Sequence, residues 1–129
     1  MRHTTPLQMR FGDTDALGHI DNAAFAQYAE AGRLDFLAQL GVDVTLIILA
    51  NLSIDFRSQA RFGERLDIET RVERVGQTSM TLLQTVNANG RVSAEMRSVV
   101  VLYDYEQRSP RAIPALLREQ LERYGTERT

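Results

Sequence analysis

The residues best suited to chemistry lie in one short segment, from Arg10 to Phe25, which reads RFGDTDALGHIDNAAF. It holds two carboxylates, Asp13 and Asp15, and one imidazole, His19. A carboxylate in such a loop can attack an activated carbonyl carbon or take a proton from water. The residue types also fit a plainer role, because Asp ahead of a helix often caps it and a lone His is often structural. Spacing alone leaves both interpretations open.

A helix is expected directly after this segment, from about Asn22 to Leu40. Either Asp21 or Asn22 can cap its first turn, and Gly41 is suited to end it. The N-terminus of a helix presents unpaired N–H groups and a partial positive charge. An oxyanion that develops on a carbonyl placed there would be stabilised. One apolar stripe recurs at helical spacing: Phe25, Tyr28, Ala29, Gly32, Phe36 and Leu40.

After residue 49 the hydrophobic period changes from helical to alternating, which predicts strands. Asn89-Gly90 predicts a type I′ hairpin turn, because both residue types tolerate positive φ. The end of the chain, residues 113–124, resembles a short, solvated amphipathic helix. We expect one α+β domain over residues 1–129, with a core at about 7–114 and a mostly antiparallel sheet of four or five strands. The expected strands cover residues 7–11 (an edge strand), 50–56, 66–73, 78–87 and 91–103.

The composition is that of an ordinary globular domain, with 43% hydrophobic and 25% charged residues in 129. A net charge of −2 and a pI near 5.7 argue against a nucleic-acid binder. With no cysteine and two histidines, we expect no metal site and no cofactor. The longest apolar run, residues 46–50, is too short to span a bilayer, and the first residues do not resemble a signal peptide. We therefore expect a cytoplasmic protein without membrane contact.

The last long strand is apolar on both faces. Val99 and Val101 alternate with Met96, Val100 and Leu102, so the two sets point to opposite sides of the sheet. One helix covers only one face of a sheet and leaves its edges free. We expect a homo-oligomer that buries the second face.

The loop segment resembles the signature of the 4-hydroxybenzoyl-CoA thioesterase family of hotdog proteins. The family pattern is an aromatic residue, Asp-x-Asp, Gly-His-Ile/Val, Asn and a second aromatic residue. Weaker similarities follow in the family's order at residues 27–33, 54–56, 60–64 and 75–79, and the whole resemblance spans about residues 7–114. The residues that match the loop pattern are Phe11, Asp13-Thr14-Asp15, Gly18-His19-Ile20, Asn22 and Phe25.

This resemblance implies a hotdog fold, in which a sheet wraps a long central helix. It also implies roles for the loop residues. Asp15 would act on the thioester, and the backbone N–H near Asn22 would polarise its carbonyl. Gly18 would keep the loop tight beside the substrate, His19 would shape the loop rather than serve as the base, and Asp13 would be structural.

The implied substrate is an acyl-CoA or acyl-carrier thioester, hydrolysed to the acid and the free thiol. Family members form dimers or tetramers with the active site at a subunit interface. Asp21 stands where related sequences often have Asn, and it either raises the pKa of Asp15 by repulsion or caps the helix; we favour the cap. The acyl group would meet Phe25, Tyr28 and Phe56, and candidate phosphate partners are Arg57, Arg61 and Arg65, each of which also fits a solvated turn.

Three other functions fit less well. Some hotdog proteins are enoyl-thioester hydratases that pair an Asp with a His, and His19 lies four residues after Asp15. A non-catalytic module would bind acyl-CoA without turnover. A plain α+β interaction domain would have no affinity for acyl-CoA, which a thermal-shift titration would reveal.

Overall fold

The long helix forms where the sequence predicts it. In the computed structural model, which describes residues 1–125, α1 spans Asn22–Gln39. The side chain of Asp21 caps the helix by accepting a hydrogen bond of 3.2 Å from the N–H of Ala23. At the other end Gly41, at φ +82°, closes a Schellman motif in which the N–H of Val42 donates to the carbonyl of Leu37.

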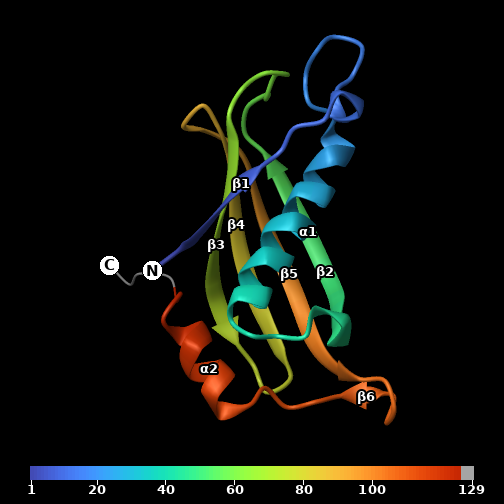
Figure 1. Ribbon diagram of the computed structural model, residues 1–129, viewed down its shortest axis with the longest axis vertical. Helices are drawn as coiled ribbons and strands as arrows, with labels where there is room; N and C mark the ends of the chain where they lie inside the picture. Colours follow the sequence, from blue (N-terminus) through green and yellow to red (C-terminus); the bar gives the residue numbers. More distant parts are fainter. Residues whose placement is uncertain (126–129) are drawn as a thin grey trace.

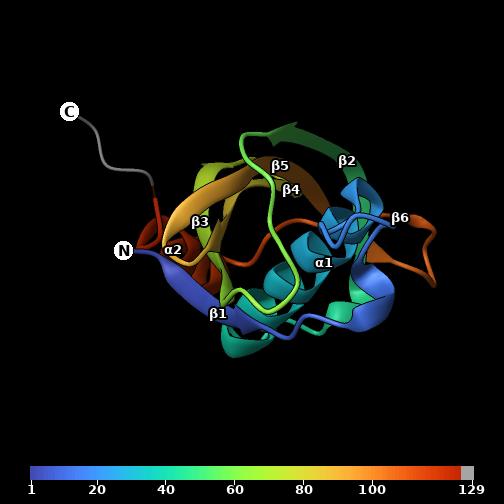
Figure 2. The ribbon, with the colours of Figure 1, turned by 90° about the horizontal axis from the view of Figure 1, so that it is seen from above.

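An antiparallel sheet curls around this helix (Figures 1 and 2). The strand order is β1-β3-β4-β5-β2, with the short β6 paired to β5. This arrangement confirms the expected α+β class and the helix wrapped by a sheet. Asn89 and Gly90, at φ 50° and 80°, form the predicted turn between β4 and β5. The strands are β1 (His3–Leu7), β2 (Ile47–Phe56), β3 (Leu66–Val75), β4 (Ser79–Ala88), β5 (Arg91–Asp104) and β6 (Ser109–Pro110).

The first strand lies earlier in the chain than predicted. The edge strand expected at residues 7–11 is β1, His3–Leu7, which pairs with β3 from His3–Thr70 to Leu7–Leu66. Pro6, which lacks an N–H, is tolerated because β1 lies at the edge of the sheet. The chain then leaves the sheet, since Asp13 accepts hydrogen bonds from the backbone and side chain of Arg10 and closes a short 3-10 turn, η1 (Phe11–Asp13).

The end of the described chain also differs from the prediction. The tail forms α2 (Ala115–Glu122), but it is not simply solvated, because Leu121 is fully buried against the core. The N–H of Val72 on β3 donates to the carbonyl of Tyr124, which fixes the tail to the sheet. A second short 3-10 turn, η2 (Val44–Leu46), joins α1 to β2.

Close contact between α1 and the sheet depends on Gly32. A Cβ at this position would lie 2.6 Å from Cγ2 of Ile68 on β3. Beside it the buried Gln84 donates through Nε2 to the carbonyl of Ala29 at 3.1 Å and to Oγ1 of Thr70 at 3.3 Å. This polar contact lies between two apolar clusters, one around Phe25 at the helix start and one around Phe36 near its end.

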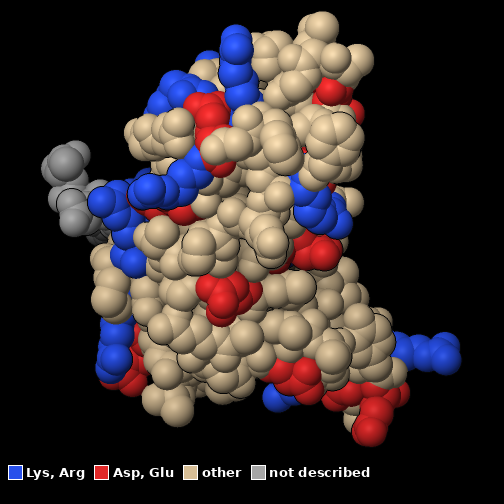
Figure 3. Space-filling model, turned by 45° about the horizontal axis from the view of Figure 1, so that its top comes forward, with Lys and Arg blue, Asp and Glu red and all other residues tan. Residues whose placement is uncertain are grey.

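The surface carries small groups of both charges. On the side seen in Figure 3, acidic and basic side chains lie next to one another, and much of the area is uncharged. Within residues 1–125, no helix is long and apolar enough to cross a membrane. On β5, Met96 and Val100 face the core, whereas Val99 and Val101 are only half-buried on the other side of the sheet.

Candidate active site

The first acidic residue of the loop is a buried anchor. Asp13 is 4% exposed, and its Oδ2 accepts hydrogen bonds from the Tyr28 hydroxyl at 2.8 Å and from the Arg10 backbone at 3.1 Å. Its Oδ1 accepts from the Arg10 guanidinium at 3.0 Å. Burial alone would raise the pKa of Asp13, but these hydrogen bonds and the Arg10 charge outweigh it and lower the pKa. Asp13 is therefore ionised and joins the loop to the helix.

The second acidic residue is held differently. Oδ1 of Asp15 accepts hydrogen bonds from the backbone N–H groups of Leu17, at 2.8 Å, and His19, at 3.0 Å. The bond from Leu17, with that from His19 and the nearby imidazole, lowers the pKa of Asp15, so this carboxylate is ionised at neutral pH. Its side chain is 39% exposed in the single chain. Asp15 is thus a fixed anion with one oxygen, Oδ2, left for chemistry.

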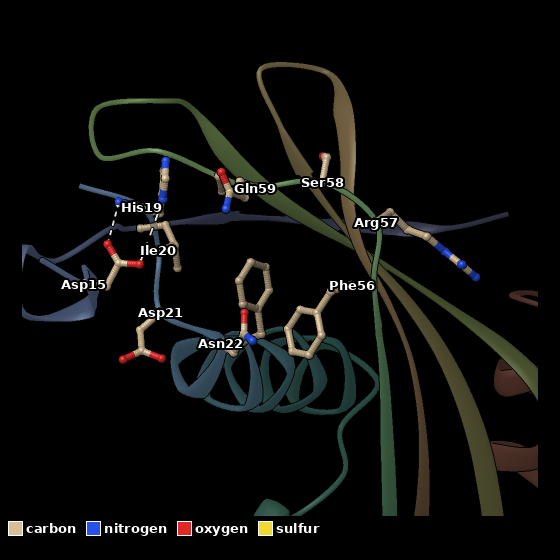
Figure 4. Close-up of a pocket in the computed structure, with 11 residues that line it drawn as sticks. Asp15, His19, Ile20, Asp21, Asn22, Phe56, Arg57, Ser58 and Gln59 are labelled. Atoms are coloured by element: carbon tan, nitrogen blue, oxygen red, sulfur yellow. Dashed lines mark hydrogen bonds and ion pairs between the residues drawn. The ribbon is translucent and has the colours of Figure 1, made fainter. Parts of the chain in front are cut away.

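Figure 4 shows how the loop and the helix start are placed around a cavity of about 490 Å³. Asp15 and His19 lie on one side, and Asn22, the first residue of α1, lies below. Phe25 and Phe56 form an apolar wall, with ring centroids 5.5 Å apart in an edge-to-face arrangement. The cavity is lined by Asp15, His19, Ile20, Asp21, Asn22, Phe25, Phe56, Arg57, Ser58, Gln59 and Ala60.

The start of α1 lies at this cavity. Asn22 begins α1, so its N–H has no carbonyl one turn earlier to bind. The Asp21 side chain takes the N–H of Ala23, as a cap does, and Asp21 is not among the groups that shift the pKa of Asp15. The favoured role of Asp21 as a cap is therefore confirmed.

The structure brings most of the expected site residues to this cavity, namely Asp15, His19, Asn22, Phe25, Phe56 and Arg57. Four others lie outside its lining, among them Arg65, whose backbone N–H donates to Oδ1 of Asn89 at 2.8 Å. Gly18, at φ +80°, forms the tight turn of the loop behind it. Tyr28 is buried beneath Phe25, bound to Asp13, and Arg61 forms a backbone bridge with His19. Arg57 already lies 3.3 Å from a carboxylate oxygen of Glu95.

The polar side chains of the loop after β2 were not predicted to lie at the site. Ser58 and Gln59 line the cavity because the backbone N–H of Ile20 donates to the carbonyl of Ala60 at 2.7 Å, which brings this loop onto the Asp15 loop. In Figure 4 the Gln59 amide extends toward the space above Asn22. The only signal in the sequence is the polar run that follows Phe56 at the end of a strand.

The carboxylates and the imidazole at the site do not form a metal-binding group in the part of the chain that the structure describes. Within residues 1–125, no group of three or more His, Asp and Glu side chains is arranged to hold a metal ion. The cavity brings together an ionised carboxylate, neighbouring amides and a helix terminus beside an apolar wall.

Known acyl-CoA thioesterases are similar to this chain over most of its length. The chain is 26% identical over 117 residues to the acyl-CoA thioester hydrolase YbgC of Escherichia coli O6:H1, covering 84% of this chain and 87% of the relative. It is 25% identical over 126 residues to the long-chain acyl-CoA thioesterase FadM of Escherichia coli K12, covering 92% and 96%.

Solved structures agree with the sequences. A predicted thioesterase from Bacillus stearothermophilus superposes with a TM-score of 0.90 at 27% identity, and each chain is covered completely. A thioesterase from Thermus thermophilus, complexed with coenzyme A and Zn, superposes with a TM-score of 0.85 at 25% identity, covering 94% of this chain and 92% of that one. The sequence model of the thioesterase-like superfamily matches residues 9–121. The chain therefore belongs to the thioesterase-like superfamily and has the hotdog fold.

Proposed function

We propose that this protein hydrolyses acyl-CoA thioesters to the free acid and CoA, with Asp15 as the catalytic carboxylate. Family membership makes the chain a thioester hydrolase, and the two relatives named above are acyl-CoA thioesterases. The observation that carries the proposal is the position of Asp15, an ionised carboxylate in a cavity that also contains the start of α1. A thioester needs no metal for this reaction, because its acyl group is already activated.

The proposed substrate pose follows from the lining of the cavity. The carbonyl oxygen points to the N-terminus of α1, where the N–H of Asn22 and the partial positive charge stabilise the developing oxyanion. The acyl group lies along Phe25 and Phe56. The nucleotide of CoA lies at the surface, where Arg57 and Arg61 can meet its phosphates once Arg57 leaves Glu95.

Two chemical routes use the same oxygen of Asp15. In one, Oδ2 attacks the carbonyl carbon, the C–S bond breaks, the thiolate leaves, and water then hydrolyses the mixed anhydride. In the other, Oδ2 takes a proton from water, the water oxygen attacks the carbonyl carbon, the C–S bond breaks, and the proton passes from Asp15 to the departing thiolate. A single turnover in ¹⁸O-labelled water identifies the first route when water attacks the Asp15 carbonyl of the anhydride, because the label then enters Asp15 and the released acid carries an unlabelled Asp15 oxygen. Direct attack of water on the thioester labels the acid and never Asp15.

We also propose that the active form is a homodimer or homotetramer with the site at a subunit interface. Two observations support this. β2 is paired on one side only among the described strands, and Phe56 at its end is 47% exposed beside the cavity. Light scattering on the eluting protein should give two or four times the 14.6 kDa of one chain. An active protein with the mass of one chain would contradict this proposal.

The direct test of function is a panel of acyl-CoAs and acyl-carrier thioesters, scored for thiol release. We expect turnover of acyl-CoAs and, since CoA is the proposed carrier, a cytoplasmic enzyme. The proximity of His19 to Asp15 favours a hydratase as the second candidate. A crotonyl thioester distinguishes the two, because a hydratase removes the double bond without releasing thiol. Loss of the double bond with no thiol release from any substrate would overturn the proposal.

A further inference from the structure

One buried polar atom in the site has no partner. Among the described residues, Nδ1 of His19 is the single buried side-chain nitrogen or oxygen that makes no hydrogen bond. Such atoms are rare in folded proteins, because an unpaired buried polar group costs free energy. This nitrogen lies 4.0 Å from Oδ2 of Asp15, and Figure 4 shows the ring edge turned toward that carboxylate. This distance is too long for a hydrogen bond, but it places the imidazole next to the carboxylate.

The two oxygens of Asp15 are not equivalent. Oδ1 accepts two backbone N–H groups, from Leu17 and His19, which occupies both of its lone pairs. Oδ2 accepts no bond among the described residues other than the approach of the imidazole. A carboxylate fixed through one oxygen can still turn its other oxygen about that anchor. The reactive oxygen therefore lacks a second point of support, and Nδ1 of His19 lies where one would be needed.

We propose that His19 is a positioning residue for Asp15, with its proton on Nδ1, which it donates to Oδ2 when substrate binds. The opposite tautomer would point a nitrogen lone pair at a carboxylate, which is repulsive. An approach of roughly 1 Å completes the bond, and catalytic hydrogen bonds are often long before substrate binds. Oδ2 then keeps one lone pair for the thioester or for water. The expected effect of His19 on turnover rests on the proposed function, whereas the assignment of the proton to Nδ1 of His19 does not.

The inference is tested first by NMR, without any substrate. The chain has two histidines, and the other one, His3, contacts Oδ2 of Asp35 through Nε2 at 2.7 Å. Ring ¹⁵N–¹H correlations should show Nδ1–H for His19 and Nε2–H for His3. Asp15→Asn should move only the His19 signals, and Asp35→Asn only those of His3. An unprotonated Nδ1 on His19 would overturn the inference. It would also be overturned if the His19 signals did not shift in Asp15→Asn.

Kinetics then test the role in turnover with a matched pair of variants. His19→Asn retains an N–H near the position of Nδ1, whereas His19→Gln places its amide near that of Nε2. We expect His19→Gln to lower kcat by about 10- to 100-fold, the value of a hydrogen bond to a charged group. We expect His19→Asn to recover most of this loss, and His3→Asn to change nothing. The affinity for a non-hydrolysable S-alkyl CoA should be the same in all four proteins.

The outcomes separate this inference from the proposed function. The positioning role would be contradicted if the Asn and Gln variants of His19 lost kcat equally, or if neither lost any. In both cases turnover by the wild type would still support the proposed thioesterase activity. A wild type that releases no thiol would overturn the proposed function, and the NMR experiment would still decide the Asp15–His19 pairing.

Discussion

The Tyr28 hydroxyl donates a hydrogen bond of 2.8 Å to Oδ2 of Asp13, and this contact joins the second turn of α1 to the loop that carries Asp15. Both residues are buried, at 4% exposure each. Asp13 and Asp15 are two residues apart but have different surroundings, one enclosed and fully bonded and the other at a cavity. The structural role of Asp13 and the proposed catalytic role of Asp15 therefore follow from the groups around each carboxylate.

Removal of this hydroxyl should destabilise the fold. Tyr28→Phe leaves a buried carboxylate with one bond fewer, which should lower the free energy of unfolding by about 1–3 kcal/mol. Urea denaturation measures it. Tyr105→Phe is the matched control, because Tyr105 is 53% exposed, and it should leave the midpoint unchanged. Equal stability of Tyr28→Phe and wild type would show that this contact does not hold the loop.

The contact between Tyr28 and Asp13 also predicts how the free energy of unfolding depends on pH. Burial opposes ionisation of Asp13, but the bonds from Tyr28 and Arg10 prevail and lower its pKa. A group with a lowered pKa in the folded state stabilises the protein above its unfolded pKa, about 4 for Asp, and this contribution is lost as the pH falls through the folded value. The stability difference between wild type and Tyr28→Phe should therefore shrink below about pH 4. A difference that stays constant from neutral to acid pH would contradict this assignment.

Gly32 should not tolerate a side chain. Gly32→Ala places a Cβ 2.6 Å from Cγ2 of Ile68 and 3.0 Å from Nε2 of Gln84. Overpacking of this kind costs about 1–3 kcal/mol, and the better helix propensity of Ala returns about 1 kcal/mol. We expect a net loss of stability in thermal denaturation. Gly12→Ala is the control, because nothing lies within 4 Å of its added Cβ. If Gly12→Ala shifted the midpoint as much as Gly32→Ala does, the steric explanation would be refuted.

Phe56 should contribute to substrate binding more than to chemistry. Its ring packs edge-to-face on Phe25 at the cavity wall, where the acyl group is proposed to lie. Phe56→Ala should raise KM for medium-chain acyl-CoAs by about tenfold or more, with a smaller change in kcat, because it removes apolar contact made equally before and during the reaction. Leu116→Ala is the control, because this side chain on α2 is 70% exposed. A fall in kcat alone would place Phe56 in the chemical step.

Local patterns predicted much of this fold. The bounds of α1, its Asp21 cap, the Gly41 end and the Asn89-Gly90 turn each depend on residues close in sequence, so they could be read directly. The same holds for the alternation that marks β3 and β4. The family motif predicted that Asp15 and Asn22 lie near each other because both belong to one continuous segment, and both line the cavity.

Features that depend on distant partners were not predictable. Ser58 and Gln59 reach the cavity only because Ile20 binds the backbone at Ala60, a contact across forty residues of sequence. Tyr28 fitted the apolar stripe, but its hydroxyl binds Asp13 and stays behind the cavity lining. The start of β1 was misplaced because its strand character comes from pairing with β3, whereas residues 8–11 are not paired in the sheet.

Thiol release by Asp15→Asn, measured beside wild type and Asp21→Asn on one acyl-CoA, tests the central claim most directly. Asn keeps the shape of both side chains and caps a helix as well as Asp does. Because a positioned carboxylate contributes about 100-fold or more, Asp15→Asn should lose at least that factor in kcat, whereas Asp21→Asn should stay within about threefold of wild type. Undiminished turnover in Asp15→Asn would remove this carboxylate from the reaction.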